Sequence, residues 1–244
     1  MRPARKGHIR SWSELAGYAE AMAGEPWIFR GESSTRNPLR PGAGRVSDDL
    51  GPRRTQRFTE RDEREALERF KRDALPFLEY RLPPDHDLEW LAIAQHYGMQ
   101  TRLLDWTESL LIAAFFAVEG AGAHGNASAI IYGVKDLPVV APTADPFGLR
   151  EVAVYRPSRV TPRIGPQWSI FTIHPQPTAD FRKSGRLSEW RLPGRARCER
   201  IKLVLDSCGI NYASLYPDLS GLARHIYWRY KWGVKQSKPA VPSR

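Results

Sequence analysis

Residues 91–120, LAIAQHYGMQTRLLDWTESLLIAAFFAVEG, form one of the most apolar stretches of this chain. The polar side chains of Gln95, His96, Arg102 and Asp105 nevertheless lie inside the stretch. A polar group among residues that must be buried needs a partner, because leaving it unpaired costs roughly 2–7 kcal/mol, and more for a charge. These four side chains therefore form either a closed internal network or the wall of a site.

The same stretch predicts two helices. The first covers 87–97 and is followed by Gly98, in the position where glycine commonly terminates a helix. The second begins at Thr107 or Glu108 and ends at Gly120. Both are mostly apolar, so we expect both to be buried.

Apolar periodicity and turn residues divide the rest of the chain. Helices and strands mix without the regular alternation of a doubly wound sheet, so the predicted fold is α+β. We expect a single domain over 11–232, between a flexible basic arm at 1–10 and a flexible tail at 233–244. The expected helices cover 11–22, 59–80 (kinked or ended at Pro76) and 218–232, and the expected strands cover 27–30, 127–134, 152–155, 169–174 and 201–205.

The composition suggests a polyanionic partner. The chain has 244 residues, 41% of them hydrophobic, which is enough for a substantial core. Its 37 basic and 27 acidic side chains give a net charge of +10. This favours nucleic acid first, then a phosphate-bearing ligand or an anionic membrane surface. The alternative is a basic protein that uses arginine freely for no special reason.

Several classes of protein are disfavoured. The only cysteines, Cys198 and Cys208, have no metal-like spacing, which argues against zinc and against a disulfide framework, so no metal is expected. The N-terminus lacks the apolar segment of a signal peptide. The longest apolar run, 110–118, is far short of the ~20 residues of a membrane helix. We expect a cytoplasmic protein without membrane contact, and a monomer, although the sequence does not fix the oligomeric state. Phosphate-binding loops, dinucleotide-binding glycine patterns and hydrolase nucleophile motifs are not found.

A second polar interruption lies at Arg30, which ends the apolar run Trp27-Ile28-Phe29 and precedes Gly31. Arginine suits bidentate binding of phosphate, and glycine lets a ligand approach the backbone closely. The alternative is a structural arginine paired with Glu32 or Asp105.

The other candidates also have structural alternatives. Arg102 and Asp105 are three residues apart and could form an internal salt bridge. His96 could be a metal ligand, a general base or a hydrogen-bonded core histidine. Gln167 could hydrogen-bond a sugar hydroxyl. We expect Arg30, Arg102 and Gln167 to converge on one cleft.

Two segments carry most of the excess positive charge. The first is a long loop over 33–57, and the second is the basic, loop-like segment 178–200. Phe181 and Trp190 within the second segment, and Trp168 shortly before it, offer stacking surfaces for bases. A solvated basic face is the alternative. The arginines expected to bind nucleic acid are Arg36, Arg40, Arg45, Arg182, Arg195 and Arg197.

Four motifs, in the same order along the chain, resemble those of the FRG domain family. Phe29-Arg30-Gly31 and then NPLRP at 37–41 resemble the motif that gives the family its name. The family's long central signature is matched by QHYGMQTRLLDWT at 95–107. The two later motifs are QWSIFT at 167–172 and LYPDLSGL at 215–222.

The family's layout is similar to that of ADP-ribosyltransferases, which implies a mainly antiparallel mixed sheet with surrounding helices. On this likeness Arg30 would hold the diphosphate or ribose of NAD. Thr101 and Thr107 would line the nicotinamide side, and Gln167 would replace the glutamate that orients a ribose hydroxyl. The chain has no Glu-x-Glu around Gln167, which disfavours arginine or protein carboxylate acceptors.

The resemblance therefore implies an ADP-ribosyltransferase that uses NAD as a substrate and modifies nucleic acid, of the bacterial defence or toxin type. The alternative is a non-catalytic nucleic-acid-binding or effector-sensing module. The expected catalytic residues are Arg30, Gln167 and Asp105, and the expected NAD-binding residues are Arg30, Gly31, Gln95, His96, Thr101, Arg102 and Thr107.

Overall fold

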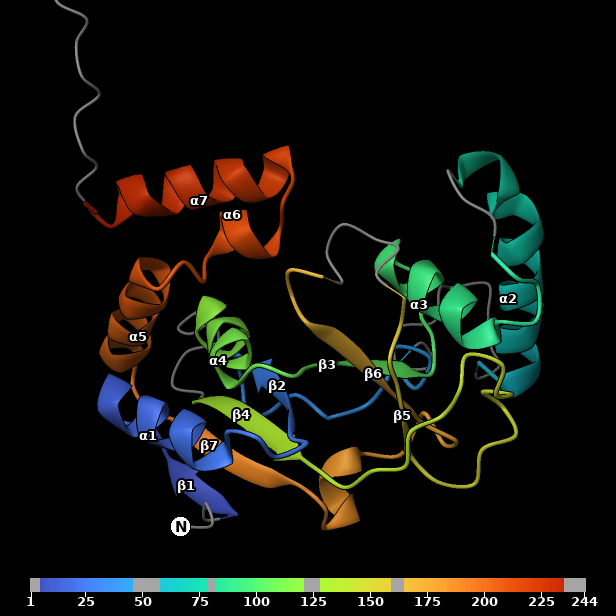
Figure 1. Ribbon diagram of the computed structural model, residues 1–244, viewed down its shortest axis with the longest axis horizontal. Helices are drawn as coiled ribbons and strands as arrows, with labels where there is room; N and C mark the ends of the chain where they lie inside the picture. Colours follow the sequence, from blue (N-terminus) through green and yellow to red (C-terminus); the bar gives the residue numbers. More distant parts are fainter. Residues whose placement is uncertain (1–4, 46–57, 79–81, 121–127, 159–164, 235–244) are drawn as a thin grey trace, which may run out of the picture.

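The computed structural model of the protein describes most of the chain and is drawn in Figure 1. The described residues are 5–45, 58–78, 82–120, 128–158 and 165–234. None of the helices within these ranges is both long and apolar enough to cross a membrane.

A seven-stranded sheet in the order β1-β7-β4-β2-β3-β6-β5 forms the centre of the protein. Only β1 and β7 pair in parallel, and the other described neighbours are antiparallel. The fold is therefore α+β with a mixed, mainly antiparallel sheet, as expected. The strands are β1 (Lys6–His8), β2 (Ile28–Glu32), β3 (Leu103–Thr107), β4 (Ala129–Val134), β5 (Ala153–Tyr155), β6 (Ser169–Ile173) and β7 (Ser188–Leu192).

The sheet is weakly joined between β2 and β3. Strand β2 pairs with β4 along its whole length, and β3 pairs with β6 in the same way. Between β2 and β3, the one pair of facing residues is Phe29 and Thr107. The two strands therefore diverge beyond this pair, and their backbone groups there are free to meet side chains or ligands.

One face of the sheet packs against α4. Gly31 makes this close approach possible, since a Cβ on it would lie 1.9 Å from the Ala113 carbonyl oxygen. Phe29, Ile131 and Trp190 share the core cluster on this face with buried residues of α4. Figure 1 shows α1 and α5 beside this layer and α6 and α7 above it. The helices are α1 (Trp12–Met22), α2 (Glu60–Ala74), α3 (Asp87–His96), α4 (Leu110–Glu119), α5 (Arg195–Ser207), α6 (Tyr212–Leu215) and α7 (Leu219–Lys231), with 3-10 turns η2 (Leu75–Phe77) and η3 (Phe181–Ser184).

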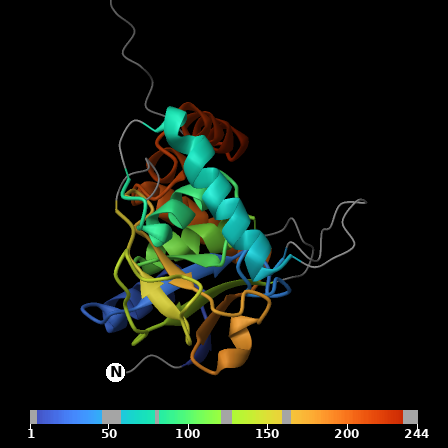
Figure 2. The same ribbon diagram turned by 90° about the vertical axis from the view of Figure 1, so that its right-hand side faces the viewer.

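Two further core clusters complete the packing. Ile28, Trp106 and Ile130 lie on the opposite face of the sheet from α4, where Leu39 and Phe181 cover them. The third cluster joins α2 and α3 to β3, β5 and β6. Figure 2 shows α2 as the long helix on the near side. Its start at a Thr59 capping box and the break at Pro76 agree with the sequence prediction.

Three sequence predictions about elements were wrong. The strand expected over 201–205 lies inside α5, because Cys198, Ile201 and Leu205 are buried at helical spacing. Residues 6–8 of the expected flexible arm form β1, which extends the sheet beside β7. Strand β7 itself lies in the segment 178–200, which was expected to be a loop. Most of the expected C-terminal tail lies outside the described residues.

Candidate functional site

A cavity of about 290 Å³ opens where β2 and β3 diverge. Its walls come from four parts of the chain: β2, β3, α4 and the turn that precedes β6. Polar side chains predominate around its mouth, and Phe116 adds an apolar surface. The lining includes Arg30, Gly31, Asp105, Thr107, Phe116 and Gln167.

Arg30 stands on β2 at the edge of this cavity and bridges the diverging strands. Its Nε and Nη2 bind Glu32 Oε1 at 2.8 and 2.7 Å. Its Nη1 donates to the backbone oxygen of Asp105 at 2.8 Å, with Asp105 Oδ2 at 3.7 Å. Both structural partners considered from the sequence are therefore present, and the side chain still lines the cavity. A phosphate bound here would share the guanidinium with Glu32.

Asp105 lies across from Arg30 on β3, and its side chain is 61% exposed. Gln95 Nε2 donates to Asp105 Oδ1 at 2.9 Å. The buried Thr101 hydroxyl in turn donates to Gln95 Oε1 at 2.5 Å. This chain of hydrogen bonds holds the carboxylate at the mouth of the cavity. Gln95 and Thr101 thus support Asp105 and are not among the cavity's lining residues.

Gln167 reaches the cavity from the turn before β6. Its Nε2 donates to the Leu215 carbonyl oxygen at 3.0 Å, which leaves Oε1 as an acceptor. Thr107 Oγ1 donates to the Gln167 backbone oxygen at 2.8 Å and fixes the turn to β3. The next residue, Trp168, has a φ of 49°, in the left-handed region that a bulky side chain rarely adopts. The turn is therefore held in an unfavourable conformation that presents Gln167.

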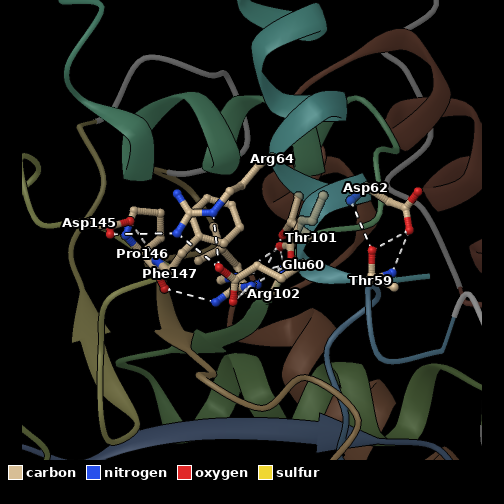
Figure 3. A network of polar contacts seen from close by, with 11 residues as sticks. Thr59, Glu60, Asp62, Arg64, Thr101, Arg102, Asp145, Pro146 and Phe147 are labelled. Carbon is tan, nitrogen blue, oxygen red and sulfur yellow. Dashed lines mark hydrogen bonds and ion pairs between the residues drawn. The ribbon is translucent and has the colours of Figure 1, made fainter. Parts of the chain in front are cut away.

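Arg102 does not join this site, so the prediction of a common cleft for Arg30, Arg102 and Gln167 was wrong for Arg102. Its guanidinium is 1% exposed and pairs with Glu63 of α2 at 2.9 Å. Figure 3 shows Arg102 reaching the Pro146 carbonyl oxygen, with Arg64 on the neighbouring Phe147 ring. Both arginine side chains lie 4.0 Å from the centre of that ring. The arginine is a structural connector between α2 and the start of β3.

The expected Arg102–Asp105 salt bridge is also absent. Residues three apart meet on a helix, but in a strand they point to opposite faces. The segment that begins at Leu103 is β3, so Asp105 turns toward Arg30. Glu63 gave only a weak signal in the sequence, as a carboxylate inside a highly charged helix.

His174 is a site neighbour that the sequence did not single out. It is buried, and burial together with the charge of Arg30 lowers its pKa from 6.5 to about 4. Trp106 Nε1 donates to Thr172 Oγ1 at 2.8 Å, and the same hydroxyl lies 2.8 Å from His174 Nε2. The hydroxyl accepts from Trp106 and still has one donor and one acceptor site, so this contact fits either tautomer of the neutral ring.

Two other candidates have structural explanations. The missing Cβ of Gly31 faces the backbone of α4, so helix packing requires this glycine, whereas the sequence interpretation invoked a ligand. His96 ends α3 and packs edge-on against Tyr97, with ring centres 4.9 Å apart, and does not line the cavity. Within the described ranges no cluster of His, Cys, Asp and Glu could hold a metal ion.

The arginines expected to bind nucleic acid fall into two groups. Arg182 donates to the Thr35 carbonyl oxygen, which joins it to the loop that carries Arg36, Arg40 and Arg45. Arg182 also pairs with Asp180 at 2.5 Å, so part of its charge is neutralised. The second group, on α5, contains Arg195, which pairs with Glu199, and the exposed Arg197. The part of the first loop over 46–57 lies outside the described residues.

Comparison with protein-family models matches residues 25–126 to the FRG domain. This range begins just before β2 and covers α2, α3, β3 and α4. It therefore includes Arg30 and Asp105 but not Gln167. No curated protein and no solved structure matches the chain.

Proposed function

The chain contains an FRG domain at residues 25–126, and from this premise we propose that it is an ADP-ribosyltransferase that transfers ADP-ribose from NAD to nucleic acid. One observation carries the proposal: a cavity between two diverging strands, with Arg30 on one wall and the acceptor oxygen of Gln167 on another. Its volume, about 290 Å³, accommodates the nicotinamide–ribose half of NAD, with the rest of the dinucleotide outside.

In the proposed reaction the bond between ribose C1′ and the nicotinamide nitrogen breaks, and nicotinamide leaves with the bonding electron pair. A base nitrogen of the acceptor then attacks C1′, and the acceptor loses a proton. The ribose passes through an oxocarbenium-like state, which needs positioning and charge stabilisation more than a strong nucleophile. Gln167 Oε1 would accept a hydrogen bond from a ribose hydroxyl.

The side chains around the cavity suit these steps. Arg30 already makes two ion pairs, so a diphosphate would compete with Glu32 for the guanidinium. Asp105 is an exposed carboxylate at the cavity mouth, where it would stabilise the positive charge on the ribose or accept the acceptor's proton. Thr107 would act indirectly, by holding the turn that carries Gln167.

The nucleic-acid acceptor is inferred from charge. The net charge of +10 and the exposed Arg36, Arg45 and Arg197 would attract a phosphate backbone. Binding would then weaken steeply as salt increases, because bound counterions are released. Reversing the charge at Arg195 and Arg197 would weaken binding to all sequences alike. An affinity that is flat between low and physiological salt would contradict this part of the proposal.

The direct test is incubation with labelled NAD and single- or double-stranded DNA or RNA. We expect label on nucleic acid with the wild type and none with Arg30→Ala. Gln167→Ala should reduce turnover more than NAD binding, because its contact strengthens in the transition state. Arg61→Ala is the matched control, since Arg61 is 88% exposed on α2 and pairs with the exposed Glu65 of the same helix. Full transfer by Arg30→Ala would remove that residue from the mechanism.

The alternative is a non-catalytic module that binds nucleic acid or senses an effector. The neutralisation of Arg30 by Glu32 and Asp105 favours it, because such a guanidinium has less charge to offer a phosphate. NAD turnover separates the two functions. If the wild-type protein neither binds nor consumes NAD in the presence of any of these nucleic acids, the non-catalytic function is the correct one.

A further inference from the structure

A second cavity, of about 310 Å³, lies among α4, α5, α6 and α7. It shares no lining residue with the cavity between β2 and β3. Figure 1 shows these four helices at one end of the molecule, with α7 above α4 and α5. The proposed NAD reaction makes no use of it.

Lys202 of α5 is the central group of this cavity. The residue is only 9% exposed, and its Nζ donates to the Tyr212 hydroxyl at 3.0 Å. Nζ also lies 4.7 Å from the centre of the Tyr212 ring and 5.4 Å from that of Trp228. Within the described part of the chain, Lys202 makes no ion pair. An ammonium has three donors, so two of them are left for a ligand.

Burial without a direct ion pair destabilises the charged form of this lysine. Desolvation lowers the pKa of Lys202 to about 8, with opposing effects from Glu119, which raises it, and Arg224, which lowers it further. A buried cation without a counterion is unfavourable for folding. An anionic ligand would supply the missing counterion.

The remaining charges leave the cavity positive. Arg195 pairs with Glu199 at 2.7 Å, and Arg224 with Glu119 at 3.5 Å. These pairs account for both carboxylates among the lining residues. Lys202 and the exposed Lys231 are left without an acidic partner among the described residues.

Aromatic rings form much of the remaining wall. Tyr227 is 67% exposed and Trp232 is 37% exposed, so both have ring surface available to a ligand. Exposed aromatic rings beside a basic groove are typical stacking surfaces for nucleic-acid bases. The combination of two unpaired ammonium groups with open aromatic rings fits a ligand that carries both a phosphate and an aromatic base.

We propose that this cavity is a nucleotide-binding site, in which Lys202 and Lys231 hold the phosphate and Tyr227 or Trp232 stacks on the base. Its volume lies at the lower end of the roughly 300–1,000 Å³ of small-molecule sites, which suits one nucleotide. The nucleotide is either free or part of a single strand. The site goes beyond the proposed NAD reaction and does not depend on it.

The test is calorimetric titration with AMP, inorganic phosphate and a single-stranded pentanucleotide, all in the absence of NAD. We expect saturable binding of AMP or of the pentanucleotide, and weaker binding of inorganic phosphate, which cannot stack. Tighter binding of AMP assigns a free nucleotide, and tighter binding of the pentanucleotide assigns a strand. Arg30→Ala should bind equally well, which separates this site from the NAD cavity.

The variants test which residues bind the ligand. Lys202→Met keeps most of the packing of the alkyl chain and should weaken binding by about tenfold or more, since a charge-assisted contact is lost. Lys231→Met gives a second test at an exposed position, where folding is not at risk. The matched control is Lys135→Met, because Lys135 also lies over an indole ring, that of Trp27 at 5.5 Å, but outside this cavity. No saturable binding, or equal binding by wild type and both cavity variants, would overturn the proposal.

Discussion

Arg30 and Arg102 look alike in the sequence but serve opposite purposes in the structure. Each interrupts an apolar segment, and each makes an ion pair with a glutamate. The Arg102 side chain is 1% exposed and its partner Glu63 is 2% exposed, whereas the Arg30 side chain is 17% exposed and lines a cavity. An arginine within an apolar segment is therefore not by itself a sign of a ligand site.

The difference lies in how completely each guanidinium is surrounded. Arg102 is enclosed by Glu63, the Pro146 carbonyl oxygen and the Phe147 ring, so no ligand can reach it. Arg30 lies where β2 and β3 diverge. Its contacts leave one side of the guanidinium facing the cavity. Stability should depend on the first region and ligand binding on the second.

The largest expected effect is that of Glu63→Ala. It leaves the Arg102 guanidinium buried without its carboxylate, which typically costs about 3–5 kcal/mol. Denaturant unfolding measures the loss. Glu65→Ala is the control, because Glu65 is 64% exposed on the same helix and should cost about 0.5 kcal/mol or less. Equal losses of stability in the two variants would show that burial of the Arg102–Glu63 ion pair does not matter for stability.

Acid should destabilise the protein through His174. Its pKa in the folded protein, about 4, lies below the ordinary 6.5, so the unfolded chain binds the proton first. The stability that this depressed pKa provides is complete above pH 6.5 and is lost as the pH falls toward 4, by about 3 kcal/mol. Between pH 7 and pH 4.5 the unfolding free energy should fall less for His174→Gln than for the wild type. Parallel pH profiles would contradict the assignment.

The same histidine reports on the cavity. The positive charge of Arg30 contributes to the lowered pKa of His174, after burial. Arg30→Ala should therefore raise the pKa of His174, and titration of the ring by NMR measures the change. Arg61→Ala is a suitable comparison, because Arg61 is 88% exposed on α2 and does not contribute to the lowered pKa of His174. An unchanged value in Arg30→Ala would mean that burial alone sets the pKa.

Arg30→Ala itself should affect ligand binding more than folding. Loss of a charge-assisted contact costs on the order of 1.5–3 kcal/mol of NAD affinity, or about 10- to 150-fold. Calorimetry and thermal melting measure the two effects separately. Arg30→Lys should also bind weakly, since lysine cannot reproduce the bidentate fork. If Arg30→Ala lowers the melting temperature as much as Glu63→Ala does and leaves the NAD affinity unchanged, Arg30 has a structural role like that of Arg102.

The smallest expected effect is the stability change of Asp105→Asn. This side chain is 61% exposed, and such ion pairs contribute about 0.2–1 kcal/mol. Asparagine keeps an oxygen that accepts from Gln95, so folding should hardly change. Loss of label transfer with a preserved melting temperature would assign Asp105 to the reaction. A fall in melting temperature in proportion to lost activity would support a structural role.

The sequence predicted the elements whose patterns are local. The expected starts of α1 and α2 are confirmed, with Ser11 and Thr59 as the capping residues, and the apolar runs predicted α4 and β4. Strands β3 and β7 were missed, because their pairing partners are distant in sequence and their own residues carry charges. The helix at 195–207 was partly mistaken for a strand, since a short apolar run fits either period.

By itself, the sequence determined an α+β fold, motifs that resemble those of the FRG domain and the presence of polar groups that need partners, because composition and spacing are properties of the chain alone. It did not determine the partners. Glu63 and Arg102 are 39 residues apart, and Arg30 and Asp105 are 75 apart, so only the folded sheet brings each pair together. Tertiary structure also decided that β2 and β3 diverge beyond Phe29 and Thr107. That divergence gives Arg30 a cavity, while close packing of α2 against β3 encloses Arg102.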